Sequence, residues 1–235
     1  MTLDASTLVC QGFSPPLKWA DFKLAAFDMD STLINIECID EIAAVAGKKA
    51  EVAAITEAAM RGEIKDFRDS LQRRLALLQG VPASALQEVL DTRLQFNPGA
   101  EVLMATLRAR GIKTLLVSGG FTFFADYVQQ RLQMDFARAN ALEIVDDKLT
   151  GKVLQQSWGD VVDGEEKRRT MLEIAKSLSA SPAQCIAVGD GANDLPMMQA
   201  AGLSVAYHAK PAVRAQAMLA INAGGLDRLQ SVFAD

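Results

Sequence analysis

Two aspartates separated by one residue lie just after a short apolar run near the start of the chain. Asp28 and Asp30 belong to the segment Phe27-Asp28-Met29-Asp30-Ser31-Thr32, which follows Leu24-Ala25-Ala26. The apolar run predicts a strand, and open α/β sheets carry their chemistry at the carboxyl ends of strands. If the strand ran straight through both aspartates, their side chains would share one face and repel, unless a cation neutralised them or one stayed protonated. A turn opened by Asp28 and a helix capped by Asp30 would explain the pair without chemistry.

Polar residues also follow two later apolar runs, and a lysine lies near the start of a later helix. Ser118-Gly119-Gly120 comes after 114–117, Gly189-Asp190-Gly191-Ala192-Asn193-Asp194 comes after 185–188, and Lys167 lies within the predicted helix 165–178. Because strand ends of one polarity meet at one edge of a parallel sheet, these groups can approach the aspartate pair. They offer an anion site, a phosphate-binding charge and hard oxygen ligands for a divalent cation. Taken singly, a plain turn or a solvated lysine explains each as well, and calcium stays open, although the spacing of an EF-hand loop is absent.

The composition limits the class of protein. The chain has 235 residues, 50% of them hydrophobic, and a net charge of −5, which argues against nucleic acid as a partner. Cys10, Cys38 and Cys185 are scattered and odd in number, as expected of reduced thiols in a cytosol. The sequence contains no signal-peptide pattern and no apolar run as long as a membrane span, so we expect a cytoplasmic protein without membrane contact. Either a monomer or a homodimer fits the sequence.

The order of the predicted elements indicates an α/β fold with a doubly wound, mostly parallel sheet. Helical periodicity across 39–94, without a strand signal, predicts a helical bundle inserted into the α/β domain. We therefore expect a core domain of residues 1–35 and 97–235 and a helical domain of residues 36–96. Residues 1 to about 20 are expected to form an irregular arm. The other expected elements are strands 24–28, 114–117, 185–188 and 203–206, helices 101–110, 124–132, 165–178 and 195–201, and a hairpin of 141–145 with 148–153.

The four polar clusters together resemble the four motifs of the haloacid dehalogenase superfamily of phosphotransferases, in order and in separation, with a helical cap inserted after the first motif. Within that superfamily the chain is similar to the phosphoserine phosphatase family over roughly residues 22 to 233. The resemblance implies hydrolysis of O-phospho-L-serine to L-serine and phosphate, the last step of serine biosynthesis, with Mg²⁺ as cofactor. The segments that carry this similarity are Asn35-Ile36-Glu37-Cys38-Ile39-Asp40-Glu41, Ala59-Met60-Arg61-Gly62, Ser70-Leu71-Gln72-Arg73-Arg74, Val117-Ser118-Gly119-Gly120-Phe121 and Ala209-Lys210-Pro211.

The resemblance also implies a role for each acid. Asp28 is expected to be the nucleophile that forms an aspartyl-phosphate, and Asp30 to protonate the leaving serine oxygen and later accept a proton from water. Mg²⁺ is expected to bind the carboxylates of Asp28 and Asp190 and the backbone carbonyl of Asp30. Asp194 and Asn193 are expected to orient those ligands or to reach them through water.

The phosphate of the substrate is expected to contact Ser118, Gly119 and Lys167, with Asn193 also among the substrate-binding residues. The stretch before Lys167 is a few residues longer than in familiar members of the family. Arg168 is therefore the alternative for the role of that lysine.

In the cap, the resemblance assigns the substrate ammonium to Glu37, its carboxylate to Arg74 and an apolar wall to Met60 and Phe67. Without the resemblance, Glu37 would be explained as a first-turn helix acid and Arg74 as a surface charge. Adjacent helical residues point in different directions, so only one of Arg73 and Arg74 can face a pocket, and we expect Arg74.

Two competing functions stay open. One is phosphoryl transfer to a small alcohol such as homoserine, or hydrolysis of a different small phosphomonoester. The other is a receiver-like phospho-acceptor switch without enzymatic activity, although such proteins are shorter and have no helical insertion.

Some bacterial relatives carry an N-terminal regulatory domain, and the roughly twenty residues before the first strand lead us to expect none here. His208 is expected to be a loop histidine, since Asp30 already fills the role of a base.

Overall fold

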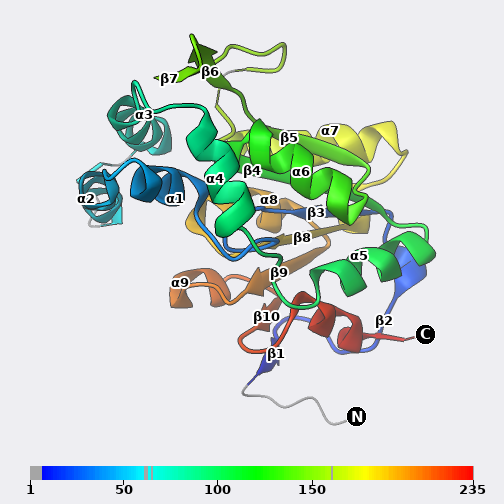
Figure 1. Cartoon of the computed structure of the whole chain (residues 1–235). Coiled ribbons are helices and arrows are strands. Elements are labelled where there is room, and N and C mark those ends of the chain that lie inside the picture. The colour runs from blue at the N-terminus through cyan, green and yellow to red at the C-terminus, as the bar shows by residue number, and fades with distance from the viewer. Residues whose placement is uncertain (1–6, 61–62, 65, 160, 235) are drawn as a thin grey trace.

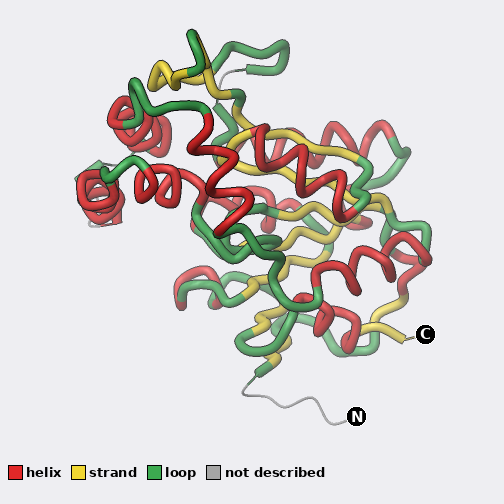
Figure 2. The backbone as a smooth tube through the Cα atoms, in the orientation of Figure 1, coloured by secondary structure: helices red, strands yellow, loops and turns green. Residues whose placement is uncertain are grey.

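The computed structural model describes residues 7–60, 63–64, 66–159 and 161–234, and only the backbone of residues 59 and 60. These residues contain a seven-stranded sheet in the order β1-β10-β9-β8-β3-β4-β5 (Figures 1 and 2). All neighbouring strands are parallel except β1, which pairs antiparallel with β10 at the edge. The expected doubly wound, mostly parallel sheet is confirmed. Its strands are β1 (Leu8–Cys10), β3 (Leu24–Phe27), β4 (Lys113–Phe121), β5 (Phe136–Asn140), β8 (Cys185–Gly189), β9 (Leu203–Tyr207) and β10 (Leu219–Ile221).

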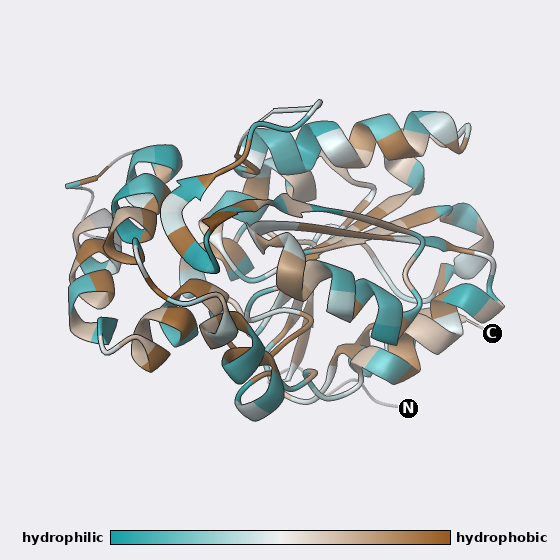
Figure 3. Ribbon diagram, turned by 45° about the horizontal axis from the view of Figure 1, so that its top comes forward, coloured by the Kyte–Doolittle hydropathy of each residue, from teal (hydrophilic) through white to brown (hydrophobic). Residues whose placement is uncertain are grey.

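Strand β3 lies in the middle of the sheet and is buried on both faces. Ala25 and Phe27 point into one hydrophobic cluster, whereas Leu24 and Ala26 point into the other. The first cluster includes side chains of α5 (Ala100–Ala109) and α6 (Thr122–Leu132). The second includes side chains of α7 (Gly164–Ser177), α8 (Leu195–Ala200) and α9 (Pro211–Arg214). Burial of both faces explains why this strand is apolar throughout rather than alternating, and Figure 3 shows hydrophobic strands between helices with hydrophilic outer faces.

The regular elements described between β3 and α5 are four helices. They are α1 (Cys38–Val45), α2 (Lys49–Met60), α3 (Phe67–Leu77) and α4 (Ser84–Thr92). The first three gather on one side of the molecule in Figure 1. A hairpin of β6 (Leu142–Val145) and β7 (Lys148–Val153) joins this group, because backbone hydrogen bonds connect Leu149 with Gly80 and Val81.

Three expectations about the sheet are wrong or incomplete. The arm is not irregular throughout, since Leu8–Cys10 forms edge strand β1 and β2 (Leu17–Lys18) pairs with β11 (Phe233–Ala234). Strands β5 and β10 were not predicted. The sequence of β5 contains Arg138, which gives no apolar run, and the ion pair of Arg138 with Glu166 on α7 (2.7 Å) makes this charge compatible with the sheet. Strands of three residues such as β1 and β10 are too short for a periodic signal.

The remaining described elements are short 3₁₀ helices at Trp19–Asp21, Pro182–Gln184, Ala192–Asp194 and Leu226–Val232. Within the described residues, no helix combines the length and the apolar character needed to cross a membrane.

Candidate active site

Asp28 lies immediately beyond the last residue of β3, at the carboxyl edge of the sheet. Its backbone N–H donates to the carbonyl oxygen of Val188 on β8 (2.9 Å), so the ladder of the sheet continues to this residue. The side chain is buried, and its Oδ1 accepts a hydrogen bond from Lys167 Nζ (2.6 Å). Lys167 is fully buried and also donates to Asp194 Oδ1 (2.7 Å). One ammonium therefore connects the end of β3 with the turn that follows β8.

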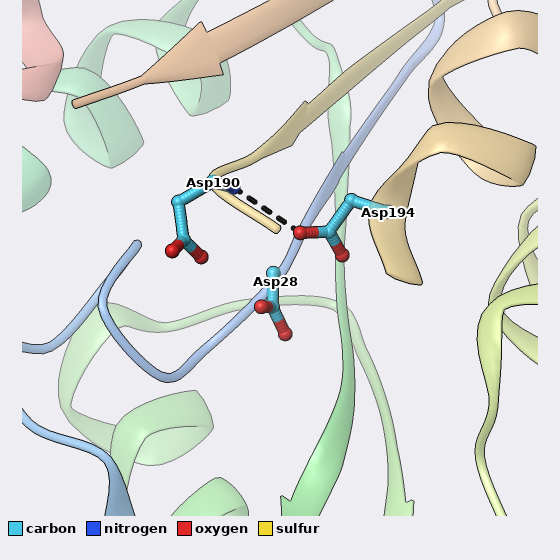
Figure 4. A group of neighbouring side chains, drawn as sticks. All are labelled: Asp28, Asp190 and Asp194. Carbon is cyan, nitrogen blue, oxygen red and sulfur yellow. Dashed lines mark hydrogen bonds between the residues drawn. The ribbon is translucent and has the colours of Figure 1, made fainter. Parts of the chain in front are cut away.

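Three carboxylates meet at this edge, as Figure 4 shows. Oxygens of Asp28, Asp190 and Asp194 all lie within 4.8 Å of one another. Asp194 Oδ2 accepts the backbone N–H groups of Asp190 (3.1 Å) and Gly191 (3.0 Å), so both of its oxygens are bound by the protein. Asp190 Oδ1 accepts a hydrogen bond from Thr32 (3.3 Å). This set of hard oxygen donors is of the kind that binds divalent cations.

Burial and the charge of Asp194 raise the pKa values of two acids of this cluster, Asp28 and Asp190. Burial, followed by the charge of Asp194, raises the pKa of Asp28 well above its ordinary value, although Lys167 opposes the shift. The same two causes raise the pKa of Asp190 to about 7. Burial works against the charge of Lys167, but the carboxylates of Asp194 and Asp28 outweigh it and raise the pKa of the ammonium. The cluster carries more negative charge than one lysine can balance, and a divalent cation would relieve the excess.

Asp30 has different partners from Asp28, because β3 ends at Phe27 and does not run through both residues. Asp30 Oδ2 accepts the backbone N–H of Cys38 at the start of α1 (3.1 Å), and Oδ1 accepts the thiol of the same residue (3.1 Å). Loss of water around the carboxyl, followed by the charge of Glu37, raises its pKa to about 7, although the contacts with Cys38 oppose this. The two aspartates are therefore chemically unequal.

The cluster Ser118-Gly119-Gly120 lies within β4 rather than after it, because the strand continues to Phe121, with a shift in its pairing to β5. The buried Ser118 Oγ accepts the backbone N–H of Gly120 (2.9 Å). A side chain at Gly119 would meet the ring of Phe67 on α3 at 2.9 Å and the carbonyl oxygen of Val162 at 3.2 Å. Phe67 thus lies against this backbone, and only glycine fits there without a shift of the ring.

Asn140 was not predicted as part of the site. Its side chain donates to the carbonyl oxygen of Gly119 (2.7 Å) and accepts the backbone N–H of Val162 (2.8 Å). It is fully buried, so these two bonds fix the glycine segment to the chain that leads into α7. The only signal in the sequence is an asparagine at the end of an unpredicted strand, which does not identify such a role.

The predicted substrate residues lie on several elements around these acids. Glu37 accepts a hydrogen bond from Ser31 Oγ (2.6 Å) and keeps an exposed side. Arg74 is half-buried, and its Nε makes a long bond to the carbonyl oxygen of Ser70 (3.4 Å). Burial lowers its pKa, against the opposing charges of Asp40, Glu37 and Asp30.

Three of the other residues named in the sequence analysis have defined positions, and the side chain of a fourth is not described. Arg73 is exposed and pairs with Asp69 (2.8 Å) on the outside of α3. Arg168 pairs with Glu165 (2.8 Å) on the surface, so the structure brings Lys167, not Arg168, to Asp28. Asn193 lies in the same turn as Asp190 and Asp194, with its Oδ1 beside Gly191. The side chain of Met60 lies outside the described residues.

The haloacid dehalogenase-like hydrolase family matches residues 22–202, and the chain belongs to this family. Within it, the chain is 63% identical to the phosphoserine phosphatase of Polaromonas sp. over 222 residues. This alignment covers 94% of this chain and 94% of the relative. The chain is 60% identical over 232 residues to the phosphoserine phosphatase of Albidiferax ferrireducens, covering 99% of this chain and 98% of the relative. A solved phospho-aspartyl intermediate analogue of phosphoserine phosphatase is similar at 38% identity with a TM-score of 0.83, covering 91% of this chain and 99% of that one.

Proposed function

We propose that the chain hydrolyses O-phospho-L-serine to L-serine and phosphate through an aspartyl-phosphate at Asp28, with Mg²⁺ as cofactor. The observation that carries this proposal is the buried Asp28 carboxylate at the end of β3, with one oxygen bound to Lys167 and two further acids beside it. The relatives at 63% and 60% identity over almost the whole chain are phosphoserine phosphatases, which supports the choice of substrate.

The acid cluster suits Mg²⁺, because it offers hard oxygens and an excess of buried negative charge. The carboxylates of Asp28 and Asp190 and the backbone carbonyl of Asp30 would hold the ion. Asp194 would keep Asp190 in place through the backbone hydrogen bond between them (3.1 Å). When bound, Mg²⁺ neutralises charge on the acids and on the phosphate of the substrate.

In the proposed reaction, Asp28 Oδ2 attacks the phosphorus, since Oδ1 is bound to Lys167 and Oδ2 accepts no hydrogen bond from the described residues. A bond between this oxygen and phosphorus forms while the bond from phosphorus to the serine oxygen breaks. Asp30 gives its proton to the departing oxygen, and a pKa of about 7 keeps a useful fraction of it protonated near neutral pH. Asp30 then takes a proton from the water that attacks the aspartyl-phosphate, which releases phosphate and restores Asp28.

Phosphate binding falls to Ser118, Gly119 and Lys167. Gly119 is half-buried and has no side chain to shield its backbone N–H, and Lys167 is held beside Asp28 by two charged contacts. Asn193 would assist from the turn after β8. Phosphoryl transfer depends mainly on positioning and charge neutralisation, so these groups suffice for the chemistry.

Substrate choice falls to the helical segment of residues 36–96, which we propose as a cap on a core of residues 1–35 and 97–235. Glu37 would bind the ammonium of phosphoserine, and Arg74 would bind its carboxylate. Phe67 and Met60 would supply the apolar wall. The ring of Phe67 already lies against Gly119, which brings the proposed wall next to the proposed phosphate site.

The test is a phosphate-release assay with Mg²⁺ across amino-acid and sugar phosphates, with and without small alcohols as acceptors. We expect O-phospho-L-serine to be hydrolysed fastest and Asp28→Asn to abolish turnover. Faster hydrolysis of another phosphomonoester, or a phosphorylated alcohol such as phosphohomoserine as the main product, would contradict the proposed substrate. An aspartyl-phosphate that persists for hours would contradict an enzymatic function.

A further inference from the structure

Asn97 lies where the chain returns from the helical segment to α5, and it donates hydrogen bonds to a stretch of backbone just beyond the aspartate pair. Its side-chain Nδ2 lies 2.8 Å from the carbonyl oxygen of Thr32, 3.0 Å from that of Ile34 and 3.3 Å from that of Ser31. Its backbone N–H donates to the carbonyl oxygen of Leu33 (2.9 Å). The carbonyl groups of the whole segment 31–34 therefore accept from one residue.

The segment 31–34 needs such a donor because it forms a single tight turn. The N–H groups of Thr32, Leu33 and Ile34 all point to the carbonyl oxygen of Met29, at 3.2, 2.8 and 3.1 Å. The carbonyl groups of the turn have no hydrogen-bond donor within the turn itself, as at the carboxyl end of a helix. Thr32, Leu33 and Ile34 are fully buried, so water does not replace a missing donor easily.

The same turn carries side chains that reach both parts of the proposed site. Thr32 Oγ1 donates to Asp190 in the acid cluster (3.3 Å). Ser31 Oγ donates to Glu37, the proposed partner of the substrate ammonium (2.6 Å). Ser31 has a φ of 56°, a left-handed conformation that serine adopts only when its surroundings hold it.

We infer that Asn97 is a positioning residue, which fixes the turn 31–34 so that Thr32 places Asp190 and Ser31 places Glu37. The inference rests on the proposed function for the role of Glu37, but not for the geometry of the acid cluster. Asn97 touches neither acid directly. It acts through the backbone of the turn. In this way it links the segment before α5 to the acid cluster and to Glu37.

The test compares the variant Asn97→Asp with a variant of a second asparagine, Asn35. Asn35 lies in the segment between β3 and α1, and Asn97 lies in the segment between α4 and α5. Asn97→Asp keeps the shape but replaces the donor NH₂ with an oxygen that faces carbonyl groups. The control is Asn35→Ala, because the Asn35 side chain accepts the backbone N–H of Gln95 (2.9 Å) and, among the described residues, donates no hydrogen bond to the turn. Asn97→Ser keeps a single donor and serves as the milder variant if Asn97→Asp does not fold.

Four quantities are measured for each folded variant: kcat and KM for O-phospho-L-serine, the inhibition constant of L-serine, and the rise in melting temperature on adding Mg²⁺ without substrate. We expect the Asn97 variant to lose about tenfold or more in kcat/KM, to bind L-serine several-fold more weakly, and to show a smaller Mg²⁺-dependent rise. The Asn35 variant should stay within about twofold of the wild-type chain on the kinetic constants and keep the full rise.

A different pattern overturns the inference. If the Asn97 variants melt at a lower temperature but keep the wild-type KM, inhibition constant and response to Mg²⁺, the residue is only structural. If the wild-type chain does not hydrolyse phosphoserine, the proposed function fails, while the Mg²⁺-dependent rise still decides whether Asn97 places the acid cluster.

Discussion

Replacement of Lys167 by methionine tests the electrostatics of the site most sharply. Methionine has a similar length but no charge, so the carboxylates of Asp28 and Asp194 lose the ammonium that lies 2.6 and 2.7 Å away. Both carboxylates are buried, and removing one partner of a buried ion pair costs about 3–5 kcal/mol of unfolding free energy. Loss of a preorganised charge at the phosphate should lower kcat by about 10²- to 10³-fold.

The stability cost should depend on pH in a defined direction. In the variant, the pKa of Asp28 rises further, since the lysine that opposes its rise is gone. The cost is therefore largest near pH 8, where the acids must ionise in the fold, and it shrinks toward pH 5, where they take up protons. Urea unfolding of the metal-free protein at both pH values measures this difference, and phosphate release with Mg²⁺ measures the kinetic loss.

Arg168→Met is the matched control, because it also removes a cation from α7. Arg168 is 41% exposed and pairs with Glu165 on the surface, so its loss should cost no more than about 0.5 kcal/mol and leave kcat unchanged. The reasoning is refuted if Lys167→Met keeps wild-type stability at pH 8 together with wild-type kcat. It is equally refuted if Arg168→Met is the variant that loses activity.

Three further predictions concern the substrate, the glycine segment and the metal. Glu37→Gln should raise KM for O-phospho-L-serine about tenfold with a smaller change in kcat, and an unchanged KM would exclude Glu37 from ammonium binding. Gly119→Ala should lower kcat/KM, because the added methyl group meets the Phe67 ring at 2.9 Å; a second change of Phe67 to leucine should restore part of the loss, and no recovery would contradict this cause. The rise in melting temperature on adding Mg²⁺ should be larger at pH 8 than at pH 5.5, because Asp190, with a pKa of about 7, is ionised only at the higher pH; calorimetry that finds the reverse would argue against the acid cluster as the metal site.

The sequence predicts well those parts of the fold whose signals are local. The strand before Asp28 and the strand before Asp190 are short apolar runs that end in polar or glycine-rich turns, and both lie where expected. Their placement side by side follows from the parallel topology rather than from any long-range pattern. The sequence leaves Lys167 and Arg168 as alternatives for the phosphate-binding charge, and the contact of Lys167 with Asp28 supports Lys167.

Residues whose role depends on hydrogen bonds to distant parts of the chain have no local signal in the sequence. Asn140 and Asn97 each hold backbone groups far away in the chain, and an asparagine beside a turn or a strand end is common without such a role. The thiol of Cys38 contacts Asp30, whereas the sequence predicts only that this cysteine is a reduced thiol. In each case the partner atom is a backbone or carboxyl oxygen whose position depends on the folded chain.

The central claim is that Asp28 itself becomes phosphorylated. The direct measurement is mass spectrometry of the peptide that contains residue 28, after rapid mixing of the wild-type chain with O-phospho-L-serine and Mg²⁺ and an acid quench within one turnover. We predict a phosphoryl group on Asp28, and none in the Asp28→Asn variant. Steady release of phosphate with no phosphoryl group on the protein, or with the group on Asp190 instead, would contradict the account.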